Sequence, residues 1–473
     1  MEAAMYPVLK NCRVRGTEDE YYLHQYFTGE EYELDSLPAK ILHECAGKRQ
    51  IQWLAENFRQ SVDEVKTFLQ TLEAGSLVEF AEKQRKTVFA DISSAPYLRE
   101  VHIDATGWCN LFGKCKHCYG RQVFEEATRE QLTTEEMIGL IEELGRLNVA
   151  NCVLSGGEVF IRKDLPLLIS HLAEQCIHIA GIFTNGTIYR EDVVAALHQE
   201  GTRTRFLVSL DGHNSDIHDF MRGRGNFEKT VAFIRKIKDA GFPVTVNTVV
   251  IRQNVQHLME MCHFLEGLGV ALWRISVPRE QGETIINREM ILPDWTDVFA
   301  IYERLIRYAI ASVNGMRFQI SSIFKTALLE ESVYYLFRPE SCCCEYKRNS
   351  ITVKPNGNVT PCTAFDNLVL GNIRRMSLSE IWYGDLAQSF KQLPIKETMC
   401  QGCELLPYCG GGCRKVAWEM HGSSLAKDES ACPLYRFTYD TVRPILREHG
   451  IRAEILDLPR PYRYDASLIN KVI

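Results

Sequence analysis

The sequence predicts an α/β fold with three parts: a winged-helix-like α+β domain, a partial (β/α)6 barrel of the TIM type, and a cysteine-rich domain. Two observations lead to this fold class. Between about residues 100 and 315, short apolar runs alternate with amphipathic helical patterns, which is typical of parallel strands covered by helices. Between about residues 320 and 440 this rhythm stops and cysteine and glycine become frequent, which indicates loops organised around a metal.

The first domain is expected to span residues 1–95 and to combine short strands with three helices. Its strand-like runs and helical patterns are, in order, Cys12–Arg15, Tyr21–Phe27, Tyr32–Leu34, Leu37–Glu44, Ile51–Phe58, Ser61–Ala74 and Leu77–Phe80. The third helix begins with a capping box, because Glu64 follows the N-cap Ser61 by three residues. One face of that helix is expected to belong to the core rather than to a groove: Val65, Phe68, Leu69 and Leu72. A linker is expected around Pro96.

The barrel is expected to span residues 96–320 and to contain six buried strands. These strands are Val101–Ala105, Cys152–Leu154, His178–Phe183, Arg205–Leu210, Val244–Ile251 and Leu272–Val277. The helices between them include Glu130–Leu147, Phe227–Ala240 and Val255–Leu268. Barrels of this form carry their chemistry at the carboxyl ends of the strands. Residues directly after the strands are therefore the candidates for function.

Three cysteines follow the first strand in the segment VHIDATGWCNLFGKCKHCYG: Cys109, Cys115 and Cys118. Three thiolates in so short a loop can hold one side of a cubane iron–sulfur cluster and leave one iron without a protein ligand. A catalytic metal requires such an open position, whereas a structural site is closed. The alternative is a structural zinc loop with a distant fourth ligand, because Cys-x2-Cys is common in zinc sites.

Polar motifs follow the next three strands as well. After the second strand comes LSGGE, Ser155 to Glu158, in which two glycines let a ligand approach the backbone and a carboxylate suits an ammonium group. Asn185 follows the third strand in FTNGT, and Ser209 and Asp211 follow the fourth in VSLDG. Each motif alone is typical of a turn. Together with the cysteine loop they predict one site on one face of the barrel.

This region resembles the radical SAM superfamily, in which a three-cysteine loop holds a [4Fe–4S] cluster and S-adenosylmethionine (SAM) chelates its open iron. The resemblance implies SAM contacts at Tyr119 (adenine), Gly156, Gly157 and Glu158 (amino group), Asn185, Ser209 and Asp211 (ribose), Arg222 (carboxylate) and Asn247. One departure is that five residues separate Cys109 from Cys115, where the family has three. A loop can absorb two extra residues, but its local shape is left open.

A second cysteine set lies in residues 321–440, where CQGCELLPYCGGGC is followed by Cys432 and preceded by the pair Cys344 and Cys362. This pattern resembles the SPASM extension of radical SAM enzymes, which binds two auxiliary [4Fe–4S] clusters. The resemblance implies an outer cluster on Cys400, Cys403, Cys409 and Cys432, and an inner cluster on Cys344, Cys362 and Cys413. The fourth ligand of the inner cluster is open between Cys342, Cys343 and a substrate thiolate. Three clusters and SAM are thus the expected cofactors.

The remaining cysteines lie within strand or helix patterns and are expected to be small buried hydrophobic residues: Cys12, Cys45, Cys152, Cys176 and Cys262. No histidine or lysine stands out as a catalytic base. Residues 441–473 form a tail without a predicted structure.

The first domain resembles the peptide-recognition element that is fused to maturases of ribosomally made peptides. That element binds a leader peptide by adding a strand to its sheet, here expected at Tyr32, Glu33 and Leu34. The expected function is therefore oxidative cross-linking of a precursor peptide by a SAM-derived 5′-deoxyadenosyl radical, first of all as a cysteine thioether. A carbon–carbon cross-link is the alternative, and formylglycine formation fits less well. A non-enzymatic electron carrier and a DNA-binding redox sensor are alternatives of another class.

Composition bounds the partners. The net charge of −7 argues against a nucleic-acid partner. No apolar stretch approaches the ~18–20 residues of a membrane span, and the N-terminus lacks the apolar segment of a signal peptide. We expect a cytoplasmic enzyme with a precursor peptide and a reductant, such as flavodoxin or ferredoxin, as partners.

Overall fold

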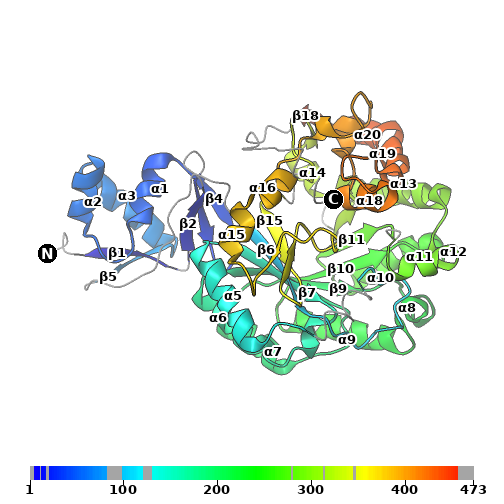
Figure 1. Cartoon of the computed structure of the whole chain (residues 1–473), viewed down its shortest axis with the longest axis horizontal. Helices are drawn as coiled ribbons and strands as arrows, with labels where there is room; N and C mark the ends of the chain where they lie inside the picture. The colour runs from blue at the N-terminus through cyan, green and yellow to red at the C-terminus, as the bar shows by residue number, and fades with distance from the viewer. Residues whose placement is uncertain are drawn as a thin grey trace.

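A computed structural model describes residues 5–10, 12–16, 21–81, 98–120, 130–278, 281–312, 315–344 and 348–455 of the 473-residue chain. A barrel occupies the centre, a small domain lies to one side of it, and the C-terminal region covers another side (Figure 1). No helix among the described residues is long and apolar enough to cross a membrane.

Seven parallel strands form the barrel sheet. They are β6 (Glu100–Thr106), β7 (Asn151–Gly156), β8 (His178–Thr184), β9 (Phe206–Ser209), β10 (Val244–Val249), β11 (Leu272–Ser276) and β12 (Arg317–Ile320). All six strands predicted from apolar runs are confirmed. The seventh, β12, was not predicted.

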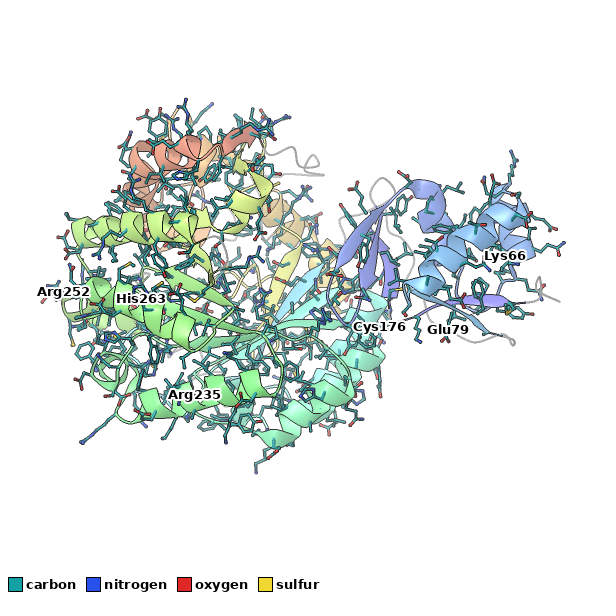
Figure 2. All side chains as sticks on the ribbon, turned by 180° about the vertical axis from the view of Figure 1, so that it is seen from behind. Lys66, Glu79, Cys176, Arg235, Arg252 and His263 are labelled. Carbon is teal, nitrogen blue, oxygen red and sulfur yellow. The ribbon has the colours of Figure 1, made fainter. Side chains whose placement is uncertain are left out.

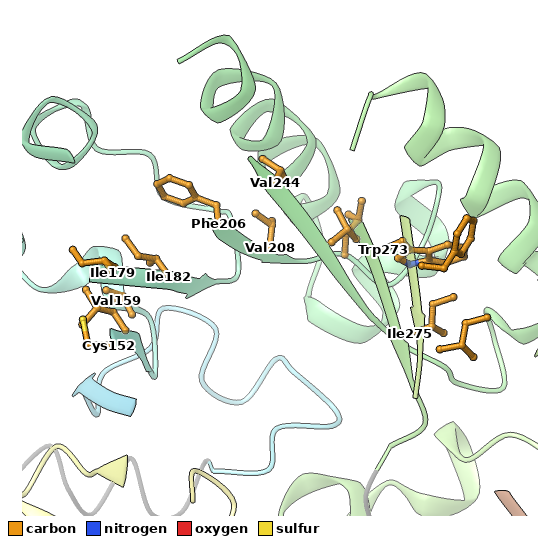
Figure 3. Packing of buried hydrophobic residues seen from close by; sticks show 14 of the residues in the cluster. Cys152, Val159, Ile179, Ile182, Phe206, Val208, Val244, Trp273 and Ile275 are labelled. Carbon is orange, nitrogen blue, oxygen red and sulfur yellow. The ribbon is translucent and has the colours of Figure 1, made fainter. Parts of the chain in front are cut away.

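Helices lie on the outside of this sheet. They are α5 (Thr134–Arg146), α6 (Leu165–Glu174), α7 (Glu191–Gln199), α8 (Ser215–Arg222), α9 (Asn226–Asp239), α10 (Leu258–Gly267), α11 (Glu283–Ile286), α12 (Arg288–Ile291) and α13 (Trp295–Ala311). Between the sheet and the helices lies a continuous apolar core that contains Phe206, Val208 and Trp273 (Figure 3). The alternation of apolar runs and amphipathic helices therefore reported the fold correctly.

Strands at both edges of the barrel sheet join the C-terminal region to the barrel. β13 (Phe324–Lys325) pairs with β12, and β15 (Ser350–Val353) pairs in parallel with β6 and extends the barrel sheet at its first edge. The other elements of this region are α14 (Ala327–Glu331), β14 (Val333–Leu336), β16 (Asn358–Thr360), β17 (Gly371–Asn372), α15 (Leu378–Tyr383), α16 (Asp385–Lys391), α17 (Leu406–Cys409), α18 (Arg414–His421), α19 (Cys432–Phe437), α20 (Arg443–Glu448) and β18 (Arg452–Ile455). The cysteine-rich loops are thereby fixed beside the carboxyl end of β6.

The N-terminal domain has its own core. A three-stranded antiparallel sheet, in the order β2 (Cys12–Gly16), β3 (Tyr21–Gln25), β4 (Glu31–Leu34), accompanies the helices α1 (Ser36–His43), α2 (Ile51–Phe58) and α3 (Val62–Ala74). A second pair joins β1 (Tyr6–Leu9), which was not predicted, to β5 (Val78–Ala81). Ser61 and Glu64 form the expected capping box, and Val65 and Leu69 are buried in the core. The linker expected around Pro96 lies outside the described residues.

The N-terminal sheet packs against the amino end of the barrel. Nδ1 of His178, at the start of β8, donates to the Tyr26 carbonyl over 2.7 Å, and the Arg203 amide, before β9, donates to the Phe27 carbonyl over 2.8 Å. Arg99, before β6, forms an ion pair with Glu31. These contacts reach the amino ends of several strands, so the domain lies at the end of the barrel opposite to the carboxyl ends of its strands.

Candidate functional site

The cysteine loop after β6 gathers its three thiols at the carboxyl end of the barrel. Burial raises the pKa of Cys109 to about 12, and the nearby Glu158 carboxylate and the thiols of Cys115 and Cys118 add to the shift. Burial also raises the pKa of Cys115 to about 11, against the opposing effect of the Arg222 guanidinium. Among the described residues, no three Cys, His, Asp or Glu side chains are close enough to bind a single metal ion.

Segments from two other strand ends hold this loop in place. The Lys116 amide donates to the Met221 carbonyl over 3.1 Å, and the Glu283 amide donates to the Cys118 carbonyl over 3.0 Å. A Cβ at Gly282, which has a φ of +54°, would lie 2.5 Å from the Cys118 carbonyl oxygen. The loop shape that the unusual cysteine spacing left open is therefore fixed by backbone contacts with neighbouring loops.

The two glycines of LSGGE are required by the protein backbone itself. A Cβ on Gly156, which has a φ of +131°, would lie 2.4 Å from the Thr106 carbonyl oxygen, and one on Gly157 would lie 2.1 Å from that of Trp108. The amides of Gly157 and Glu158 donate to the same two carbonyls over 2.8 Å and 2.7 Å. The LSGGE turn thus runs directly against the cysteine loop.

Glu158 is buried under this turn. Its carboxylate accepts hydrogen bonds from the Thr184 hydroxyl (2.8 Å), the Asn185 amide (2.8 Å) and the Phe160 amide (3.1 Å). Burial raises the pKa of Glu158 in spite of these donors. The carboxylate therefore ties β8 to the LSGGE turn at the position expected for the SAM amino group.

Asn185 connects the third strand end to the cysteine loop. Its side-chain amide donates to Asn110 Oδ1 over 2.9 Å and lies 3.9 Å from the Cys109 sulfur. Its oxygen accepts from the Thr187 amide over 2.9 Å. Asn185 thus positions the first cysteine of the loop.

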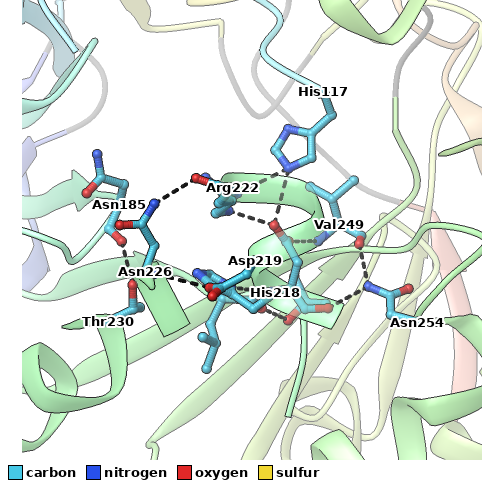
Figure 4. A network of polar contacts seen from close by, with 12 residues as sticks. His117, Asn185, His218, Asp219, Arg222, Asn226, Thr230, Val249 and Asn254 are labelled. Carbon is cyan, nitrogen blue, oxygen red and sulfur yellow. Dashed lines mark hydrogen bonds and ion pairs between the residues drawn. The ribbon is translucent and has the colours of Figure 1, made fainter. Parts of the chain in front are cut away.

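Asp211 and Arg222 belong to a buried polar network, in which Figure 4 labels Arg222, His117 and Val249. Nε of Arg222 donates to Asp211 Oδ2 over 2.6 Å, His117 lies 3.3 Å from the same oxygen, and the Val249 amide donates to Oδ1 over 2.9 Å. Burial alone would raise the pKa of Asp211, but Arg222 and His117 outweigh it and hold that pKa well below its usual range. Both carboxylate oxygens have protein partners, and through them Asp211 positions Arg222 beside Cys115; the expected contact of Asp211 with the ribose stays a prediction.

Ser209 and Asn247 occupy paired positions on β9 and β10. Neither side chain has a hydrogen-bond partner among the residues that the structure describes. Tyr119, directly after the last cysteine of the loop, is 38% exposed, yet burial of its hydroxyl raises its pKa, and Asp104 and Cys118 add to that shift. These three residues line the same end of the barrel as the cysteine loop.

A second group of thiols lies in the C-terminal region. Burial raises the pKa of Cys344 to about 11, the neighbouring thiols of Cys413 and Cys362 add to the shift, and Lys391 and Arg414 oppose it. Arg414 is 1% exposed, and its Nε and Nη2 have no partner among the described residues. A buried cation with unsatisfied donors fits a negatively charged group held by these thiols.

A third group contains four thiols of the segment from Cys400 to Cys432. Burial raises the pKa of Cys409 to about 11, and the thiols of Cys400, Cys403 and Cys432 add to the shift. Cys343 packs with Leu393, Ile395 and Leu406 beside this third group. Cys342 is 2% exposed, and its backbone forms a bridge with Pro394. Cys362 and Cys413 thus lie near Cys344, and Cys343 lies beside the third group. The role of these thiols as cluster ligands, which the resemblance implies, stays a prediction.

One buried charge cluster was not predicted from the sequence. Lys354 Nζ, after β15, lies 2.8 Å from Asp366 Oδ1 and 3.4 Å from Asp104 Oδ2, and the Ser155 hydroxyl donates to Asp104 Oδ1 over 2.5 Å. Its residues come from β6, β7 and the segments around β15 and β16. Pairing of β15 with β6 creates the cluster, and that pairing was not predicted.

Comparison with known families agrees with this geometry. Residues 103–265 match the Radical SAM superfamily, and residues 343–404 match SPASM, described as an iron–sulfur cluster-binding domain. The chain carries a radical SAM domain and a SPASM domain. Residues 1–102 lie outside both matches. A radical SAM domain binds a [4Fe–4S] cluster and SAM, and a SPASM domain binds auxiliary iron–sulfur clusters.

Two curated relatives that are similar in sequence to this chain are named for different activities. The PqqA peptide cyclase of Granulibacter bethesdensis is 28% identical over 328 residues, which cover 68% of this chain and 84% of that protein. The AdoMet-dependent heme synthase of Methanosarcina barkeri is 27% identical over 364 residues, covering 73% and 98%.

Solved structures share the fold. Streptococcus suis SuiB bound to the precursor peptide SuiA is 18% identical, with a TM-score of 0.64, and the match covers 90% of this chain and 99% of SuiB. Native anSMEcpe with bound AdoMet and the Cp18Cys peptide is 19% identical, with a TM-score of 0.59, and the match covers 74% and 98%. The partial barrel with its SPASM extension is thus an established fold.

Proposed function

We propose that this protein is a radical SAM peptide maturase that installs an oxidative cross-link, first of all a cysteine thioether, in a ribosomally made precursor peptide. One observation carries the proposal: a radical SAM domain, a SPASM domain and an N-terminal domain with an open sheet edge occur together in one chain. The names of a PqqA peptide cyclase and of SuiB bound to a precursor peptide support a peptide as the substrate.

The cluster ligands follow from the grouping of the thiols. Cys109, Cys115 and Cys118 hold the SAM-binding cluster. The inner auxiliary cluster is bound by Cys344, Cys362 and Cys413, with Cys342 as the fourth ligand that we favour, because Cys343 packs beside the outer set. The outer cluster is bound by the third group: Cys400, Cys403, Cys409 and Cys432.

When bound, the first cluster and SAM supply a radical that takes a hydrogen atom from an unactivated carbon. The chain's own residues orient the cofactor. Arg222, fixed by Asp211, stands beside Cys115 and carries the charge for the SAM carboxylate. Ser209 and Asn247 offer unpartnered polar groups to the ribose side. The buried loops around them keep water away from the reacting groups.

The leader peptide binds by strand addition to β4. In the described part of the sheet, β4 pairs with β3 alone. The Gln25 amide donates to the Glu30 carbonyl, and Tyr22 lies opposite Glu33. Hydrogen-bonded pairs alternate along an antiparallel ladder, so Glu33 directs its backbone N–H and C=O away from β3. That edge is available to a leader strand.

The deciding experiment is anaerobic reconstitution followed by two assays. SAM with dithionite should give 5′-deoxyadenosine, which the electron-carrier and DNA-binding alternatives do not predict. Any small cysteine-bearing peptide that is found encoded beside this gene should then lose ~2 Da per new bond, as the removal of two hydrogens requires. A protein that forms 5′-deoxyadenosine but leaves every such peptide unchanged in mass contradicts the peptide-maturase proposal.

A carbon–carbon cross-link is the second candidate, because curated relatives include peptide cyclases as well as a heme synthase. Alkylation of the product peptide with iodoacetamide distinguishes the two kinds of bond. A thioether removes one cysteine thiol from alkylation, whereas a carbon–carbon bond leaves every thiol reactive at the same loss of mass.

A further inference from the structure

A row of four polar residues crosses the inner face of the barrel. Ser209 pairs in register with Asn247, Asn247 with Arg274, and Arg274 with Gln319. Their neighbours along the same strands are at most 1% exposed and belong to the apolar core under the outer helices: Val208, Val246, Trp273 and Phe318. Figure 3 shows Val208 and Trp273 in this core. Because side chains alternate across a strand, the row faces the interior of the barrel.

Arg274 is the charged member of this row. None of the four side chains has a hydrogen-bond or ion-pair partner within the part of the chain that the structure describes. Burial lowers the pKa of Arg274, and Arg205, which precedes β9, lowers it further. Arg274 is thus a partly buried cation that feels the charge of the exposed Arg205, and no carboxylate of the described residues is paired with it.

The buried carboxylates of the barrel are already committed to other partners. Asp104 lies beside Lys354, Glu158 accepts three hydrogen bonds, and Asp211 holds Arg222. A desolvated guanidinium without a counter-charge is unfavourable. The missing negative charge is therefore expected to arrive with a ligand.

We propose that Arg274 binds a carboxylate of the peptide substrate, an Asp or Glu side chain near the position that is modified. A guanidinium matches a carboxylate with two parallel hydrogen bonds. The carboxylate of SAM is the other source of this chemistry, but Arg222 already stands beside Cys115 for it. SAM also brings a sulfonium cation, which adds to the positive charge. The inference rests on the proposed function and specifies its substrate.

The test uses the holoenzyme and a precursor peptide that the wild-type enzyme modifies, in versions in which each Asp or Glu is replaced by Asn or Gln. Arg274→Gln should raise the KM for the peptide and its Kd, measured by fluorescence anisotropy, by about tenfold or more. One acidic replacement should give the same loss with the wild-type enzyme and no further loss with Arg274→Gln. Arg274→Lys, which keeps the charge, should have a KM and a Kd for the peptide between those of the wild type and those of Arg274→Gln.

The control is Arg235→Gln, which removes an exposed arginine from the outside of the barrel on α9 (Figure 2) and should change nothing. The Kd of SAM should be the same in all variants. A raised SAM Kd with unchanged peptide binding would assign Arg274 to SAM and overturn the proposal, as would an equal effect of Arg274→Gln on every peptide version. If Arg274→Gln does not fold, the proposal is tested with Arg274→Lys and the peptide versions. Full peptide affinity in Arg274→Lys, together with an unchanged Kd for every peptide with an acidic replacement, would overturn the proposal. Failure of the proposed function would appear separately, as a wild-type enzyme that modifies no peptide.

Discussion

Gly157 leaves no room for a side chain because the Trp108 carbonyl oxygen would lie 2.1 Å from its Cβ. We expect Gly157→Ala to push the LSGGE turn away from the cysteine loop and to abolish SAM binding, measured by equilibrium dialysis. Gly139→Ala is the matched control, because a Cβ at this position of α5 meets nothing within 4 Å. Alanine there should raise stability by up to ~1 kcal/mol. Equal SAM affinity in the two variants would contradict the close approach.

The two cysteine sets are expected to differ in what they support. Cys109→Ala should reduce 5′-deoxyadenosine formation to background, because a ligand of the SAM-binding cluster is lost. Cys403→Ala should keep part of this activity but stop the change in peptide mass, because it affects only the outer auxiliary cluster. Chromatography of the nucleoside and mass spectrometry of the peptide check both expectations. The same rates of both products in the two variants would reject this division of labour.

At the level of single residues, the sequence motifs predicted which residues belong to the site. They did not predict which side chains contact one another. The resemblance to the radical SAM and SPASM families implied the groups of thiols, because the auxiliary sets interleave along the chain and cannot be assigned from neighbouring positions alone. The contact between Asp211 and Arg222 was not predicted, because it spans a whole helix that the motif does not include; the expected contact of Asp211 with the ribose stays a prediction. The cluster of Asp104, Lys354 and Asp366 was invisible for the same reason: it depends on strand pairing between distant segments.

At the level of elements, the turn between β3 and β4 fixes the N-terminal domain to the barrel. Burial lowers the pKa of His178 to about 4, against the hydrogen bond to Tyr26 and together with the effect of Arg205. The folded state therefore binds the proton less readily than the unfolded state. The stability from this neutral histidine is present above pH 6.5 and is lost as the pH falls toward about 4, by up to ~3 kcal/mol.

We expect His178→Asn to remove this pH dependence while keeping a donor for the Tyr26 carbonyl. Hydrogen exchange of the segment from Tyr26 to Glu30, corrected for the intrinsic rate, should speed up between pH 7 and pH 5 in the wild type and much less in the variant. His171→Asn, at an ion-paired surface position on α6, is the control. An identical pH response in the wild type and in His178→Asn would show that the histidine does not hold this junction.

Strands and helices were predicted where the sequence pattern is long or strongly apolar. All six predicted barrel strands exist because each lies in a run rich in apolar residues, as strands covered on both faces are. β1, β12 and β15 were missed because their four-residue runs, YPVL, RFQI and SITV, are short and each contains a proline or polar residues. Of these, β15 matters most, since its pairing with β6 brings the second cysteine set to the barrel.

For the whole molecule, the open edge of β4 is the feature that separates peptide recognition from chemistry. Glu33→Pro removes an outward N–H without touching the ladder between β3 and β4, whereas Glu33→Ala removes only the side chain. We expect the proline variant to bind a fluorescent leader peptide at least tenfold more weakly and the alanine variant to bind normally. SAM cleavage should be unchanged in both. Normal leader binding by Glu33→Pro would move the recognition site elsewhere.

The position of the N-terminal domain sets a minimum distance between the bound leader and the modified residue of the substrate. A leader anchored at β4 starts at the amino end of the barrel, and the cysteine loop lies beyond the full length of β6, which has seven residues. At ~3.3 Å per residue the tether must bridge more than ~20 Å. At least about seven residues should therefore separate the anchored leader from the first modified residue, and precursors with a shorter spacer should bind tightly yet emerge unmodified.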